Sequence, residues 1–174
     1  MAVANDLGTP GLRRLLIDYD STLNPGQGNA PISVERAAVL AQHLSRWKAG
    51  GVDLYVLTSS SPSKKAAALE AAGLLVHFDG VLSSTEPERF GSKGDYVWRR
   101  CKQDGWLPLE QLLADDSIEA VQSIWQGADG EDRPGGALAH TFRLPQHSKL
   151  GLTGEDLRLL DTLVFAPAPV AIYH

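Results

Sequence analysis

Residues 15–23 are LLIDYDSTL, in which an apolar run ends at two carboxylates, Asp18 and Asp20, that are followed by the hydroxyl residue Thr22. A short, continuous apolar run is typical of a strand that is buried on both faces of a parallel sheet. Ligands of such sheets bind beyond the carboxyl ends of the strands. A strand that ends near Ile17 therefore delivers both aspartates to the edge where chemistry is expected.

The rest of the chain alternates between apolar strands and helices that carry one apolar face. We expect strands near residues 12–18, 52–57, 76–82, 111–114 and 137–144, and helices over residues 33–51, 61–73, 94–103, 117–125 and 153–163. We expect Ser61 to cap the second helix and Pro62 to begin it. The alternation predicts an α/β fold, a Rossmann-like three-layer sandwich with a mainly parallel central sheet.

Length and the turn signals set the expected domain organisation. A chain of 174 residues suits one domain over residues 1–174, with a core over about 12–144 and a C-terminal part, 145–174, of one helix and an extended tail or edge strand. Residues 127–136 are polar and rich in glycine, which predicts a surface loop. The two prolines near the C-terminus equally suit one piece of a larger protein.

Composition excludes several classes of protein. The net charge is −5, and 43% of the residues are hydrophobic, which is ordinary for a globular protein and unlike a nucleic-acid binder with a basic surface. We expect no membrane contact, because no apolar run approaches spanning length and the N-terminus lacks a secretory signal. The single cysteine, Cys101, has no internal disulfide partner, which favours a cytoplasmic location.

Reactive side chains follow the other expected strands as well. Thr58 and Ser59 come after the second strand, and Asp115 and Asp116 come after a later one. Four carboxylates at one sheet edge repel each other unless a cation balances them, and a set of oxygen ligands favours Mg²⁺. With a divalent ion present, one aspartate can attack a phosphorus atom while a second carboxylate transfers the proton.

Four features follow one another along the chain: Asp18-x-Asp20-x-Thr22, then Thr58, then a lysine before a helix, and then an acidic pair. This order resembles that of the haloacid dehalogenase (HAD) superfamily of phosphohydrolases. The resemblance covers roughly residues 12–126. It implies that Asp18 is the nucleophile and that Asp18 also binds the metal through a carboxylate oxygen. It implies that Asp20 is the general acid/base and offers its backbone carbonyl to the metal, and that Thr58 donates a hydrogen bond to the phosphoryl group.

By the same resemblance, Lys93 stabilises the charge on the nucleophile and the phosphate. Lys64 and Lys65 compete with it for that role, because they occupy the first turn of a helix, where a cation needs a partner or a ligand phosphate. The pair Asp115 and Asp116 is expected to hold magnesium directly or through water, with Asp116 favoured as the direct ligand.

Tyr19, Thr22 and Ser59 flank these positions and are expected to contact the substrate. By the same resemblance, an aspartate at position 20 implies phosphoester hydrolysis or phosphomutase chemistry. A phosphomutase that resembles this superfamily needs a cap domain, and the gaps before residue 93 leave no room for one, which favours hydrolysis. The prediction is a capless magnesium-dependent phosphomonoester hydrolase.

Two other functions stay open from the sequence: a binding or regulatory module that has kept the fold, and a phosphotransferase. A small-molecule phosphate or a phosphoprotein can be the substrate, and self-association is plausible because a neighbouring subunit can serve as the lid.

Overall fold

The computed structural model describes residues 12–26, 30–89, 91–107, 110–125, 140–143 and 150–165. Five strands form one sheet: β1 (Arg14–Ile17), β2 (Asp53–Thr58), β3 (Gly80–Ser83), β4 (Gln111–Asp115) and β5 (His140–Arg143). The strand order is β3-β2-β1-β4-β5, and every neighbouring pair is parallel. The predicted α/β class and parallel sheet are confirmed.

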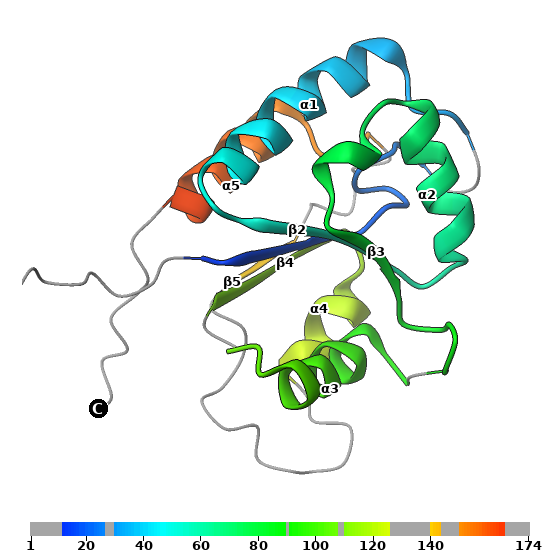
Figure 1. The fold of residues 1–174 in the computed structure, drawn as a ribbon, viewed down its shortest axis with the longest axis vertical. Helices are drawn as coiled ribbons and strands as arrows, with labels where there is room; N and C mark the ends of the chain where they lie inside the picture. Colours follow the sequence, from blue (N-terminus) through cyan, green and yellow to red (C-terminus); the bar gives the residue numbers. More distant parts are fainter. Residues whose placement is uncertain are drawn as a thin grey trace, which may run out of the picture.

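Helices cover both faces of this sheet. They are α1 (Val34–Ala49), α2 (Pro62–Ala71), α3 (Lys93–Asp104), α4 (Ile118–Trp125) and α5 (Gly154–Phe165). Figure 1 shows α1, α2 and α5 on one face and α3 and α4 on the other. The three-layer arrangement is therefore also confirmed.

The apolar run in β1 explains why the sheet is covered on both sides. Leu15 and Ile17 pack into the larger core with α1, α2 and α5, whereas Leu16 packs into a second core with α3 and α4. All three side chains are fully buried. Burial of a side chain of this size stabilises the fold by about 1.5–3 kcal/mol, so a strand with no polar face fits only this position.

One detail of the expected secondary structure is wrong, and the expected start of the second helix, with Ser61 before Pro62, is confirmed without a side-chain cap. Leu75–His77 form a 3₁₀ helix, and β3 begins only at Gly80, whereas the sequence analysis placed a strand from Val76. Val76 is 80% exposed, so its preference for strands has no packing to support it. Ser61 occupies the N-cap position of α2, but its side chain makes no capping hydrogen bond and instead pairs with the Ser63 hydroxyl at 3.0 Å.

Other boundaries agree with the expectation to within a few residues. Ser33 caps α1, where its hydroxyl oxygen accepts from the Arg36 backbone N–H. Residues 164–165 belong to α5 and not to an extended tail. The expected surface loop at 127–136 and the tail from residue 166 lie outside the described residues.

The order of the strands reverses beside β1. After β1 the chain adds β2 and then β3 on one side, and it later crosses to the other side to add β4 and β5. The carboxyl ends of β1 and β4 flank this switch point, which is where open α/β sheets form their ligand sites.

Candidate active site

Three carboxylates meet at the switch point. Asp18 follows β1 directly, Asp115 is the last residue of β4, and Asp116 comes next. Since Ile17 pairs with Ala114 in the parallel register, the three residues lie side by side, and one carboxylate oxygen from each lies within 4.8 Å of the others. All three were predicted from the sequence as metal ligands, and the structure brings them together.

Lys93 lies between two of these carboxylates. Its Nζ donates to Asp18 Oδ1 at 2.6 Å and to Asp115 Oδ2 at 2.6 Å. The neighbouring Gly94 fixes this position, because an added Cβ there would lie 2.1 Å from the Ser123 carbonyl oxygen. The absent side chain lets α3 approach α4 closely, and this approach places the first residue of α3 inside the acidic cluster.

Burial governs the electrostatics of the cluster. It raises the pKa of Asp18 to about 7, although Lys93 opposes this change, and the charges of Asp115 and Asp116 raise it further. Burial likewise raises the pKa of Asp115, again against the effect of Lys93. The pKa of Lys93 is raised above its usual value, because its two carboxylate partners outweigh the effect of its own burial. When all three carboxylates are ionised, the one ammonium of Lys93 leaves two negative charges without compensation, and the raised pKa values reflect this excess of negative charge as well as burial.

Asp20 has a different partner. Its Oδ1 accepts from Lys65 Nζ at 2.7 Å, and the Lys65 side chain is almost fully buried on the first turn of α2. The structure thus assigns the competing lysines: Lys93 pairs with Asp18, and Lys65 pairs with Asp20. The sequence analysis expected a cation in the first turn of this helix to need a partner, and Asp20 is that partner.

The predicted hydroxyl residues fall into two groups. Thr22 belongs to the cluster, because its Oγ1 lies 3.4 Å from Asp18 Oδ2 and 3.4 Å from Asp116 Oδ1. Thr58 ends β2, where its Oγ1 accepts from the Ser60 backbone N–H at 3.1 Å. Ser59 is exposed, and its hydroxyl pairs with that of Ser84 at 3.3 Å.

The turn after β1 depends on a residue that the sequence analysis missed. Arg36, on the first turn of α1, donates to the backbone carbonyls of Leu23 at 2.6 Å, Thr22 at 3.0 Å and Leu152 at 3.0 Å. The Leu152 N–H also donates to the Thr22 carbonyl at 2.8 Å. Arg36 therefore joins the acidic turn to the segment that precedes α5. Its partners are backbone atoms far apart in the sequence, so no residue pattern signals them.

Replacement of Arg36 with methionine is expected to lower the free energy of unfolding by about 2–4 kcal/mol, because three carbonyls lose their charged donor. Urea unfolding followed by circular dichroism measures this change. Arg99→Met serves as the control, since Arg99 pairs with Glu88 at an exposed site, and its removal should change stability by less than about 0.5 kcal/mol. Equal effects of the two substitutions would contradict the role given to Arg36.

Comparison with known proteins identifies the fold. No protein-family model matches the sequence, and no curated protein matches it. Among solved structures, the N-terminal part of a Bacteroides fragilis protein, which contains a phosphatase domain complexed with Mg, matches with a TM-score of 0.61 and 16% identity over 92% of this chain. This chain spans only 42% of that structure.

Two further structures match over most of their own lengths. The HAD domain of an effector protein from Legionella pneumophila has a TM-score of 0.57 at 12% identity, with 93% of this chain and 98% of that one covered. The 3-deoxy-D-manno-octulosonate 8-phosphate phosphatase from Moraxella catarrhalis, solved with magnesium, phosphate and KDO, has a TM-score of 0.54 at 13% identity, with 87% and 85% covered. The chain therefore has the fold of the HAD-like hydrolases.

The helices that the structure describes do not include a membrane-spanning segment. None of them combines the length and the apolar character that are needed to cross a bilayer.

Proposed function

We propose that this protein is a magnesium-dependent phosphomonoester hydrolase that works through an aspartyl phosphate on Asp18. One observation carries the proposal: three carboxylates cluster at the switch point of a HAD-like sheet, and the buried Lys93 pairs with two of them. The solved structures with this fold include phosphatases with bound magnesium, which supports the same conclusion.

The donor set fits a hard divalent cation. All three side chains offer oxygen atoms, and two uncompensated negative charges match one divalent ion. Both oxygens of Asp115 accept short hydrogen bonds, one from Lys93 at 2.6 Å and the other from the Ser117 backbone N–H at 2.8 Å. Asp18 Oδ2, in contrast, has only the long 3.4 Å contact with Thr22 among the described residues. We therefore assign direct ligation to Asp18, Asp116 and the backbone carbonyl of Asp20. Bound magnesium would neutralise the carboxylates and the phosphoryl oxygens.

Each step of the reaction is assigned to a residue of this chain. A carboxylate oxygen of Asp18 attacks phosphorus and forms an O–P bond while the bond to the leaving-group oxygen breaks, and Asp20 gives that oxygen a proton. Asp20 then takes a proton from water, whose oxygen attacks phosphorus and releases Asp18 and inorganic phosphate. Lys93 holds Asp18 in place, Lys65 orients Asp20, and Thr58 and Ser59 lie at the neighbouring strand end to receive the phosphoryl oxygens.

We propose a phosphorylated small molecule or a phosphoprotein as the substrate. Tyr19 lies between the two catalytic aspartates in the sequence and Thr22 follows them, and we assign both residues to substrate contact.

Magnesium is expected to stabilise the protein as well as to activate it. If the ion binds only the folded chain, magnesium at 10–100 times its Kd should raise the free energy of unfolding by about 1.4–2.7 kcal/mol. Thermal unfolding with and without magnesium measures this effect, and phosphate release from phenyl phosphate measures activity in the same samples. Asp116→Asn should remove most of the stabilisation, because it neutralises one ligand. Hydrolysis that proceeds equally well in EDTA would contradict the proposal.

A further inference from the structure

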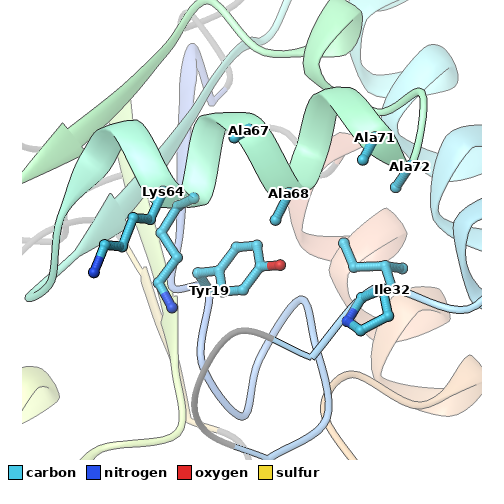
Figure 2. Close-up of a pocket in the computed structure, with 9 residues that line it drawn as sticks. Tyr19, Ile32, Lys64, Ala67, Ala68, Ala71 and Ala72 are labelled. Carbon is cyan, nitrogen blue, oxygen red and sulfur yellow. The ribbon is translucent and has the colours of Figure 1, made fainter.

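A pocket of about 520 Å³ is lined by Tyr19, which lies between Asp18 and Asp20 in the sequence, and by Lys65, the partner of Asp20. It opens between α2 and the segment that leads into α1, where Pro31 and Ile32 form one wall. The opposite wall consists of the short side chains of Ala67, Ala68, Ala71 and Ala72 (Figure 2). A volume of this size holds a small organic molecule.

Tyr19 supplies the polar group of this pocket. The residue is only 1% exposed, yet its hydroxyl finds no hydrogen-bond partner among the described residues. Figure 2 shows this hydroxyl pointing into the space between α2 and Ile32. A buried hydroxyl without a partner costs free energy, which a ligand atom in the pocket would recover. Burial also raises the pKa of this phenol, so it remains a hydrogen-bond donor at neutral pH.

Lys65 connects the pocket to the reaction. Its side chain lines the pocket, its ammonium lies 4.5 Å from the centre of the Tyr19 ring, and the same ammonium contacts Asp20 at 2.7 Å. The group that protonates the leaving oxygen is therefore one side chain away from the pocket. Lys65 is therefore the described residue that links the lining of the pocket to Asp20.

We propose that this pocket binds the leaving group of the substrate and selects phosphate esters of flat ring alcohols that carry a hydrogen-bonding oxygen at the end remote from the phosphate. This inference rests on the proposed hydrolase function. A flat ring suits the alanine wall, since no branched side chain projects from it. The remote oxygen meets the Tyr19 hydroxyl. Among the described residues, two lysines and no carboxylate line the pocket, so a neutral or anionic oxygen is favoured over a cationic group.

Three aryl phosphates with similar leaving groups test the inference: phenyl, 2-naphthyl and 6-hydroxy-2-naphthyl phosphate. The wild type should prefer the two naphthyl esters in kcat/KM, and it should prefer the hydroxylated ester by up to about tenfold, the value of one good hydrogen bond. Tyr19→Phe keeps the ring and should abolish the preference for the hydroxylated ester. The change should fall on KM rather than on kcat.

A second pair of variants tests the pocket itself. Ala71→Trp places a large side chain in the pocket from an exposed helix position, so the kcat/KM ratio of 2-naphthyl to phenyl phosphate should fall at least about tenfold. Glu70→Trp adds the same bulk at an exposed neighbouring position that does not line the pocket, and it should leave the ratio unchanged. Equal ratios in the wild type and in Ala71→Trp would overturn the inference.

Calorimetric titration with 2,6-dihydroxynaphthalene distinguishes a wrong pocket assignment from a wrong hydrolase function. Binding by the wild type that Ala71→Trp weakens would support the pocket even if none of the esters were hydrolysed. If phenyl phosphate is hydrolysed but the naphthalene diol does not bind, the hydrolase function stands and the pocket assignment falls.

Discussion

Replacing Asp18 with asparagine is expected to lower the rate of phosphate release by at least about a thousandfold, because an amide is a far weaker nucleophile than a carboxylate. Asparagine keeps the shape of the side chain, and Lys93 keeps Asp115 as a partner. The fold should therefore survive. A rate measured with phenyl phosphate at saturating magnesium, together with the far-ultraviolet circular dichroism spectrum, tests both expectations.

Two further measurements sharpen this test. Borohydride reduction during turnover, followed by mass spectrometry, should detect a modified residue at position 18 in the wild type and none in the variant. Asp53→Asn is the matched control, because Asp53 is a half-exposed carboxylate whose nearest cation, Arg14, lies at 3.8 Å. Its activity should equal that of the wild type. If Asp18→Asn keeps more than about a tenth of the activity, another group attacks phosphorus.

Replacing Lys93 with methionine is expected to cost about 3–5 kcal/mol of stability, because Asp18 and Asp115 lose their shared buried counter-charge. Methionine fills a similar volume but cannot offset either carboxylate. Activity should fall at least about a hundredfold, since one donor that stabilises the reacting charge is lost. Urea unfolding in EDTA and kinetics at saturating magnesium measure the two effects separately.

The same substitution at an exposed site provides the comparison. Lys102→Met lies near the end of the same helix and should change stability by less than about 0.5 kcal/mol. Magnesium should recover part of the stability that Lys93→Met loses, because a divalent ion supplies positive charge to the same carboxylates. A stable, fully active Lys93→Met variant would show that Lys93 does not balance the cluster.

The sequence alone determined the class of fold and the place of the acidic residues. Strand and helix periodicity are local properties, and parallel strands bring their carboxyl ends to one edge. Asp18, Asp115 and Asp116 therefore had to lie near the same edge once β1 and β4 were recognised as buried strands. Their proximity in space follows from two local patterns and one topological rule.

The resemblance favoured Lys93 as the partner of Asp18, but only the tertiary structure decided between the competing lysines and paired Lys65 with Asp20. Lys93 and Lys65 both lie in the first turn of a helix, and only the packing of α3 on α4 and of α2 beside the turn after β1 assigns them to Asp18 and Asp20. The bonds from Arg36 to three carbonyls, and the 3₁₀ turn in place of an extended strand, have the same origin. Such choices depend on contacts between distant segments, and these contacts override local propensity because burial and buried charge carry more free energy than backbone preference.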